Sequence, residues 1–215
     1  MALDDTFARG FGDGILVAGV DEVGRGPLAG PVVAAAVVVP AAVREALLTV
    51  AGDSKVLSAK KRVMVEALVR EGCRIGIGEA SVAEIDELNI RNATFLAMTR
   101  ALSQVPHGAV VVDGNAKIPG LNVPQQCVIG GDGKELAVAC ASIIAKVYRD
   151  ALMAKLGETY PAYGWAKNAG YGTAVHMDAL KHHGVTEWHR RSFAPVRDML
   201  GVGQQDESAP DAQAA

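Results

Sequence analysis

Two apolar runs joined by a glycine-rich segment constrain the fold of this chain more than any other feature. The two runs and the segment between them occupy residues 15–18, 31–39 and 19–30. Apolar runs of this length, bounded by glycine and proline, are typical of buried β-strands. Asp21 and Glu22 therefore end a predicted central strand, where a buried charge requires a partner or a metal ion. Because Gly24, Arg25 and Gly26 follow with bare backbone and a cation, we interpret the segment as a phosphodiester site.

Composition and charge restrict the class of protein. The chain has 215 residues, of which 50% are hydrophobic and 21% charged, as in an ordinary globular domain. Its formal net charge of -3 argues against wholesale binding of polyanions. Residues 1–14 and 201–215 hold six of the 24 acidic residues but one of the 21 basic residues, so the remaining chain carries +2. The body of the chain can therefore present a local basic face.

Targeting signals and cysteine patterns indicate an intracellular protein. No apolar run reaches the roughly 18 residues that span a bilayer, and the first residues lack the basic region of a signal peptide. We therefore expect a cytoplasmic protein without a membrane partner. Cys73, Cys127 and Cys140 lie among apolar residues and form no Cys-x-x-Cys pair. They are predicted to be reduced core residues.

The order of the predicted elements indicates a mixed α/β sheet. We expect strands at residues 15–20, 32–39, 73–80, 109–112 and 126–129. Helices are predicted at 41–50, 59–71, 81–85, from Asn89 or Asn92 to 103, and at 136–156, 174–181 and 195–200. Three early strands joined by short connections, followed by strands separated by helices, favour a mixed sheet.

Carboxylates follow several predicted strands. Asp21, Asp113 and Asp132 each fall at the end of an apolar strand, with Glu22 next to the first. If those strands are neighbours, the carboxylates converge beyond one edge of the sheet. Close like charges raise one another's pKa unless a cation neutralises them, and hard oxygen ligands suit Mg²⁺ or Mn²⁺. Taken singly, each aspartate is better explained as a turn former; taken together, they favour a metal site that activates water for phosphodiester hydrolysis.

The glycines around Arg25 have two further interpretations. Gly24-x-Gly26 matches part of a dinucleotide-binding fingerprint, but a predicted strand follows it where that fingerprint requires a helix. A plain glycine hairpin with an exposed Arg25 is the other alternative. The adjacent carboxylates favour close approach of this backbone to a sugar or phosphate.

The same motifs resemble those of bacterial ribonuclease HII, the type 2 ribonuclease H family. The resemblance runs from about residue 17 to 200. Its further markers are Asp53-Ser-Lys, Ile85-Asp-Glu-Leu-Asn-Ile, Val112-Asp-Gly-Asn, Gly131-Asp, Ala141-Ser-Ile-Ile-Ala-Lys-Val, Gly170-Tyr-Gly-Thr and His189-Arg-Arg-Ser-Phe. It implies a ribonuclease H-like fold, with a five-stranded mixed sheet flanked by helices. The expected divisions are a flexible lead-in (1–14), a catalytic domain (15–157), a C-terminal loop and helical appendage (158–200) and a disordered tail (201–215).

The resemblance also implies an activity. The expected enzyme is a monomeric endoribonuclease that hydrolyses the RNA strand of RNA–DNA hybrids and cuts 5′ of ribonucleotides embedded in duplex DNA, leaving 3′-hydroxyl and 5′-phosphate ends. The implied ligands of Mg²⁺ or Mn²⁺ are Asp21, Glu22, Asp113 and Asp132. The implied substrate contacts are the backbone of Gly24, Arg25 and Gly26 at the 2′-hydroxyl and the ring of Tyr171 on the following deoxyribose.

Several basic and polar residues are weaker candidates for phosphate contacts. Lys55 belongs to the Asp-Ser-Lys motif, and Ser142 and Lys146 lie one turn apart on the predicted helix 136–156, where helix packing or solvation explains them equally well. A basic cluster is expected to face the duplex and comprises Lys181, His182, His183, His189, Arg190 and Arg191. Val56, Gly130 and Ala169 stand where the family often has basic residues. These departures predict weaker backbone binding and a flatter salt dependence.

Two rival functions share these features. A DNA resolvase or integrase of the same fold would use the same carboxylates, but would cut an all-DNA duplex or junction at a comparable rate. A hybrid-binding module without catalysis would bind but show no metal-dependent hydrolysis. The presence of all four carboxylates and of Tyr171 favours the ribonuclease.

Overall fold

A computed structural model describes residues 3–51 and 59–201, and within them the strands form one mixed five-stranded sheet. The strands are β1 (Val17–Val23), β2 (Val32–Val38), β3 (Arg74–Ala80), β4 (Ala109–Asp113) and β5 (Gln125–Val128), in the spatial order β3-β2-β1-β4-β5. β2 pairs antiparallel with both β1 and β3, whereas β4 pairs parallel with β1 and with β5. The predicted mixed α/β sheet and its five strands are confirmed.

The central strand β1 is longer than the sequence predicts. It continues through Val23, so Asp21 and Glu22 lie within the strand and not beyond its end. The extension arises because β2 pairs antiparallel with β1 along this whole stretch, with Asp21 opposite Ala35. The parallel pairing with β4 stops earlier, at Val20 opposite Val112. Asp21 therefore lies just beyond the last paired residues of β1 and β4, the position at which ligand crevices form in α/β sheets.

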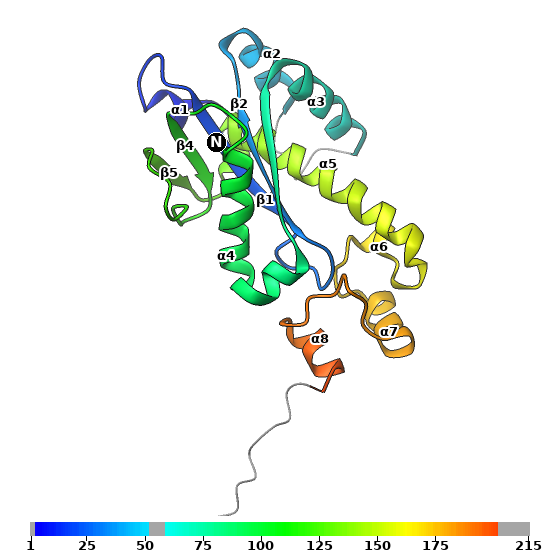
Figure 1. Ribbon diagram of the computed structural model, residues 1–215. Helices are drawn as coiled ribbons and strands as arrows, with labels where there is room; N and C mark the ends of the chain where they lie inside the picture. Colours follow the sequence, from blue (N-terminus) through cyan, green and yellow to red (C-terminus); the bar gives the residue numbers. More distant parts are fainter. Residues whose placement is uncertain (1–2, 52–58, 202–215) are drawn as a thin grey trace, which may run out of the picture.

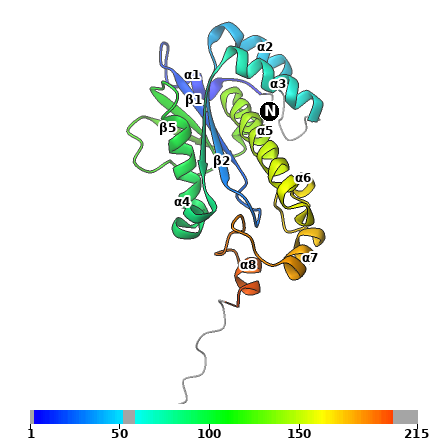
Figure 2. The ribbon, with the colours of Figure 1, turned by 45° about the vertical axis from the view of Figure 1, so that its right-hand side comes forward.

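Two long helices cover the two faces of the sheet. Figure 2 shows α4 (Val82–Leu102) and α5 (Leu136–Thr159) on opposite sides of β1 and β2. Alternate residues of β2 enter the two cores, Ala34 with the α4 side and Ala35 with the α5 side. The α5 helix packs so closely on β1 that a Cβ atom at Gly19 would lie 2.2 Å from the backbone carbon of Ala137. Small residues in β1 and β2 therefore hold α5 against the strand that carries Asp21.

The remaining helices are short and lie around this core. They are α1 (Thr6–Arg9), α2 (Ala41–Ala51), α3 (Ala59–Gly72), α6 (Trp165–Asn168), α7 (Ala174–His183) and α8 (Ala194–Met199), with 3₁₀ turns at Gly131–Gly133 and Pro161–Tyr163. Figure 1 shows α6, α7 and α8 as an appendage at the far end of α5. The predicted loop of residues 160–173 contains one of these 3₁₀ turns and α6.

The α4 helix contains both helices predicted for this stretch, the short one at 81–85 and the longer one that starts at Asn89 or Asn92. Ser81 caps it, accepting from the N–H of Glu84, whose carboxylate in turn accepts from the N–H of Ser81. At Asn89 the backbone leaves the helical region, with φ 68° and ψ 161°. The Asn89 side chain then accepts from the N–H of Asn92 at 3.1 Å, as an N-cap does. The predicted short helix and its longer successor are thus joined across a kink.

The N-terminal segment packs on the body of the molecule. Asp4 forms a parallel β-bridge with Glu135, and Phe7 and Phe11 pack against Val111 and its neighbours. The predicted tail lies outside the described residues except for Gly201. All three cysteines are free, as expected, but Cys140 alone among them is buried, whereas Cys73 and Cys127 are half-buried. Among the described residues, no helix combines the length and the apolar character needed to cross a membrane.

Candidate active site

A cleft of about 510 Å³ opens at the carboxyl end of β1 and β4. Its lining residues are Asp21, Glu22, Val23, Arg62, Asp113, Ser142, Ile143, Lys146 and Tyr171. The two strands contribute three carboxylates, α5 contributes a hydroxyl and an ammonium group, and the loop before α7 contributes a phenol ring. The structure thus brings together most of the site residues that the sequence nominated.

Asp132 lies next to this cleft without lining it. Asp113 is the last residue of β4, and its Oδ1 accepts a hydrogen bond of 2.6 Å from the N–H of Gly131. Asp132 follows directly in the 3₁₀ turn and is 3% exposed. The hydrogen bond from the N–H of Gly131 therefore holds the loop that carries Asp132 close to the carboxylate of Asp113.

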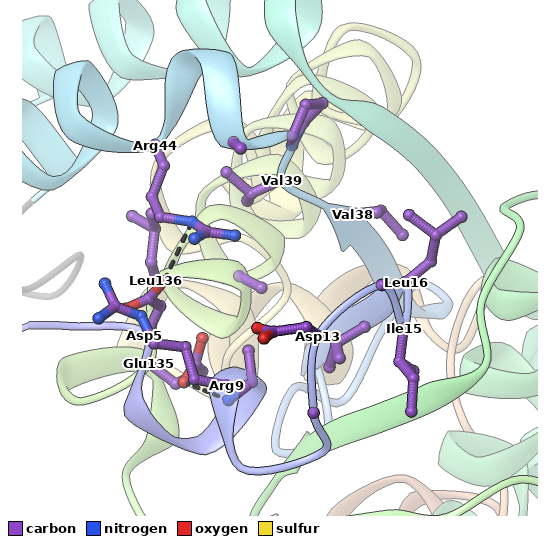
Figure 3. Close-up of a pocket in the computed structure, with 17 residues that line it drawn as sticks. Asp5, Arg9, Asp13, Ile15, Leu16, Val38, Val39, Arg44, Glu135 and Leu136 are labelled. Atoms are coloured by element: carbon purple, nitrogen blue, oxygen red, sulfur yellow. Dashed lines mark hydrogen bonds and ion pairs between the residues drawn. The ribbon is translucent and has the colours of Figure 1, made fainter.

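The N-terminal segment holds the same loop from the other side. Asp4 bonds through its backbone to Lys134 and Leu136, at 3.1 and 2.7 Å. The Oε2 atom of Glu135 accepts from the N–H groups of Phe7 and Ala8, at 3.1 and 3.2 Å. Figure 3 shows Glu135 beside Asp5, Arg9 and Arg44 in a second pocket, which the beginning of β1 also lines. This pocket and the cleft lie at opposite ends of β1, because Val17 lines the pocket and Asp21, Glu22 and Val23 line the cleft.

The carboxylates of the cleft repel one another. Burial, followed by the charges of Glu22 and Asp113, raises the pKa of Asp21 to about 8. A hydrogen bond from Ser142 opposes this shift by favouring the charged form of Asp21. Burial also raises the pKa of Glu22, against the attraction of Arg25, which lies 3.3 Å from its Oε1. A cation brought into the cleft would favour the fully ionised state.

The donor set fits a hard divalent cation. Its oxygen atoms come from aspartate and glutamate side chains, the ligands that Mg²⁺ and Mn²⁺ prefer. Within the described part of the chain, no three acidic, histidine or cysteine side chains form a ready-made ligand set. Two of the carboxylates that line the cleft come from β1 and one from β4, so an ion would have to draw the two strands' carboxylates together against the burial and repulsion that raise the pKa of Asp21.

Gly26 and Tyr171 meet at the rim of the cleft. Arg25, Gly26 and Tyr171 are exposed. A Cβ atom at Gly26 would lie 3.4 Å from the Cε1 atom of Tyr171, so the ring lies directly against the glycine. The N–H of Leu28 donates to the carbonyl of Gly170 at 2.8 Å, which joins the two loops beside this contact. Two segments about 145 residues apart in sequence therefore form one surface.

The other nominated residues differ in their positions. Lys146 lines the cleft, but its ammonium group pairs with Asp150 at 2.7 Å. Lys55 and Val56 lie outside the described residues. Gly130 has φ 65°, a conformation that L side chains rarely adopt, so its glycine suits the backbone in place of a lysine.

The predicted basic cluster is only partly on the surface. Lys181, His182 and His183 are exposed, but His189 and Arg190 are 1% and 0% exposed, so their assignment to a duplex-facing surface is wrong. Arg62, which lines the cleft from α3, and Arg149, which is buried on α5, were not nominated. Nothing in the residue pattern separates a buried arginine of this kind from a solvated one, because Arg149 stands beside Asp150 as the arginine of an exposed helix face would.

A buried pair of histidines supports the loop of Tyr171. The Nε2 atoms of His176 and His189 lie 3.0 Å apart. His189 Nδ1 accepts from the N–H of Thr186, and His176 Nε2 accepts from the indole N–H of Trp165. The network therefore assigns the proton of His189 to Nε2 and that of His176 to Nδ1, from which it donates to the carbonyl of Tyr171.

Both histidines of this pair are neutral near neutral pH. Burial, followed by the proximity of His176, lowers the pKa of His189 to about 4. Burial also lowers the pKa of His176. A proton added to Nε2 of His176 would face the Nε2–H of His189 across the 3.0 Å contact, and a proton added to Nδ1 of His189 would face the N–H of Thr186.

Comparison with known proteins identifies relatives over most of the chain. The family model of ribonuclease HII matches residues 18–196. The chain is 57% identical over 189 residues to the ribonuclease HII of Rhodospirillum rubrum, covering 86% of each chain. It is 55% identical over 193 residues to that of Paramagnetospirillum magneticum, covering 88% of this chain and 96% of the relative. Among solved structures, ribonuclease H2 from Pyrococcus horikoshii matches with a TM-score of 0.74 at 25% identity, over 86% of this chain and 97% of its own.

Proposed function

Because the chain belongs to the ribonuclease HII family and is a ribonuclease H, we propose that it hydrolyses the RNA strand of RNA–DNA hybrids and cuts 5′ of ribonucleotides embedded in duplex DNA. One observation carries the proposal. The cleft lined by Asp21, Glu22 and Asp113 also contains Tyr171, whose ring lies against Gly26. Groups for phosphodiester hydrolysis and groups for contact with a sugar thus occupy the same cleft.

The carboxylates are the proposed metal ligands. Asp21, Glu22, Asp113 and Asp132 would hold Mg²⁺ or Mn²⁺, and the burial and mutual repulsion that raise the pKa of Asp21 and Glu22 support this role. The bound ions would supply a water of lowered pKa and neutralise charge on the leaving oxygen. The products expected from attack of water on the phosphorus with loss of the 3′ oxygen are a 3′-hydroxyl and a 5′-phosphate.

Residues around the carboxylates would stabilise their ionised form and contact the phosphates of the substrate. Ser142 stabilises the ionised form of Asp21 by donating to it. Arg25 lies 3.3 Å from Glu22 and is largely exposed, so it can also meet a phosphate oxygen. Lys146 is a further phosphate contact in this proposal, exchanging its pair with Asp150 for the substrate. Lys55 stays a prediction as a phosphate contact.

Recognition of the ribose is assigned to the backbone of residues 24–26 and to Tyr171. The 2′-hydroxyl is the group that distinguishes RNA from DNA at a single position. Glycine permits the backbone to approach that hydroxyl closely, and the exposed phenol ring offers a flat face to the next sugar. This division of labour opposes the resolvase alternative, which has no use for a group that detects a 2′-hydroxyl.

The test is Asp113→Asn, with Asp198→Asn on the exposed surface of α8 as matched control. The substrate is a DNA duplex with one embedded ribonucleotide. Cleavage by the Asp113 variant should fall by more than the roughly 10–100-fold typical for loss of an outer-shell partner of a metal site. Binding of the hybrid in chelator should persist, and the products of the parent protein should carry 3′-hydroxyl ends.

Two outcomes would contradict the proposal. One is unchanged cleavage by the Asp113 variant. The other is cleavage of an all-DNA duplex by the parent protein at a comparable rate, which would support a resolvase-like activity.

A further inference from the structure

Two arginines are buried beside the glycine-rich loop of residues 24–30, which follows β1. Arg149 on α5 is 1% exposed and Arg190 is 0% exposed. Guanidinium groups are rarely buried unless their donors are fully used. Every hydrogen bond that these two groups make within the described residues goes to a backbone carbonyl oxygen.

Arg190 spans the glycine-rich loop with all three donor nitrogens. Its Nη2 donates to the carbonyl of Gly24 at 2.5 Å, its Nη1 to that of Arg25 at 3.0 Å, and its Nε to that of Gly30 at 2.9 Å. Burial, followed by the charge of Arg149, lowers the pKa of Arg190 to about 9, so the group still carries its charge at neutral pH. The loop carbonyls replace the water that would otherwise solvate this cation.

Arg149 joins the same loop to the loop of Tyr171. It donates to the carbonyls of Ala29 and Pro31 and also to that of Ala169, at 3.0, 3.0 and 2.9 Å. The fit is tight, because a Cβ atom at Gly24 would lie 2.1 Å from the Nε atom of Arg149. The two guanidinium groups therefore hold both loops that meet at the rim of the cleft.

The direction of the carbonyls decides the direction of the amides. In a planar trans peptide the C=O and the following N–H point in opposite directions, and the described chain contains no cis peptide bond. The carbonyls of Gly24 and Arg25 point at buried Arg190, so the N–H groups of Arg25 and Gly26 point away from it. Within residues 3–51 and 59–201, neither N–H has a hydrogen-bond acceptor. Both belong to exposed residues at the rim of the cleft.

We propose that Arg190, supported by Arg149, is a positioning residue for ribonucleotide specificity, which it confers by turning the N–H groups of Arg25 and Gly26 outward as a donor pair for a ribose 2′ oxygen. The inference rests on the proposed function. Without the fork of Arg190, the peptides between Gly24 and Gly26 are free to rotate, because glycine admits many backbone conformations. Lysine keeps the charge but cannot reproduce the fork that reaches three carbonyls at once.

The test compares Arg190→Lys with the parent protein, and uses Arg197→Gln on the exposed surface of α8 as matched control. Dissociation constants are measured in chelator for a duplex with one embedded ribonucleotide and for the same duplex made entirely of DNA. The parent protein and the control should prefer the ribonucleotide duplex. Arg190→Lys should lose at least about tenfold of this preference, with the all-DNA affinity within twofold. A loss of structure would weaken both affinities together.

Direct observation of the amides tests the donor pair itself, whereas the positioning role of Arg190 is tested by the change of preference in Arg190→Lys. In the ¹⁵N-labelled parent protein, the amide signals of Arg25 and Gly26 should shift on addition of the ribonucleotide duplex but not of the all-DNA duplex. Absence of this difference, or an unchanged preference in Arg190→Lys, would overturn the inference. A parent protein that shows no preference for the ribonucleotide duplex would instead overturn the proposed function.

Discussion

Replacing Glu135 by glutamine should stabilise the protein most at alkaline pH. Glu135 is 0% exposed at the start of α5 and accepts two backbone hydrogen bonds through Oε2. Its Oε1 has no hydrogen-bond partner among the described residues. Burial, with a further contribution from the charge of Asp5, raises the pKa of Glu135 from 4.5 to about 7. Arg9 and Arg44 pair with Asp5, at 2.7 and 3.0 Å, and so leave this penalty in place (Figure 3).

The size and sign of the effect follow from the two pKa values. A carboxyl group whose pKa is higher in the folded state binds its proton more tightly there, so the free energy of unfolding falls as pH rises from about 4.5 to about 7. A difference of about 2.5 units corresponds to a penalty of about 3 kcal/mol that is fully present at pH 8. Glutamine keeps a carbonyl acceptor for the N–H groups of Phe7 and Ala8 and carries no charge.

Urea unfolding of both proteins at pH 5 and pH 8 measures this effect. The stability gained by Glu135→Gln should be larger at pH 8 than at pH 5 by about 2.5 kcal/mol. Glu158→Gln, at an exposed position on the same helix, controls for the substitution itself. An equal effect of Glu135→Gln at the two pH values would refute the reasoning.

Three further predictions concern the loops around the cleft. Gly24→Ala should destabilise the protein by at least about 1 kcal/mol in thermal unfolding, because Gly24 has φ +93° and its Cβ would meet Arg149 at 2.1 Å; unchanged stability would contradict the contact. Because the pKa of His189 is depressed to about 4, the stability that its neutral form provides should be complete above pH 6.5 and fall by up to about 3 kcal/mol towards pH 4. This slope is best measured by urea unfolding in an Asp21→Asn, Glu135→Gln background, which removes the two opposing slopes for which the raised pKa is largest, and a flat profile there would count against it. Tyr171→Ala, at a 50% exposed side chain, should reduce cleavage at a single ribonucleotide more than metal binding measured by calorimetry, and equal losses would argue against its role at the sugar.

Local signals in the sequence determined the elements and the main carboxylates of the site. The strands were recognisable because apolar runs bounded by glycine and proline have few alternatives to a buried strand. Ser81, and either Asn89 or Asn92, were expected to start two helical segments, because such side chains cap free N–H groups, and the structure places the second cap at Asn89. Asp21 and Asp113 were expected together because the carboxyl ends of parallel neighbouring strands meet at one edge of a sheet. The roles given to residues 24–26 and to Tyr171 came from the family resemblance.

Only the tertiary structure decided how the segment of residues 19–30 is held. Because β1 pairs with β2 as far as Val23, the strand includes Asp21 and Glu22, which the length of the apolar run did not indicate. The carbonyls of Gly24 and Arg25 accept hydrogen bonds from the guanidinium group of Arg190, which lies 165 or more residues further along the chain. A run of basic residues has the same sequence whether it faces water or buried carbonyls, so the inward orientation of His189 and Arg190 could not be predicted. Their burial depends on contacts between distant segments, and these arise only when the appendage packs on the loop.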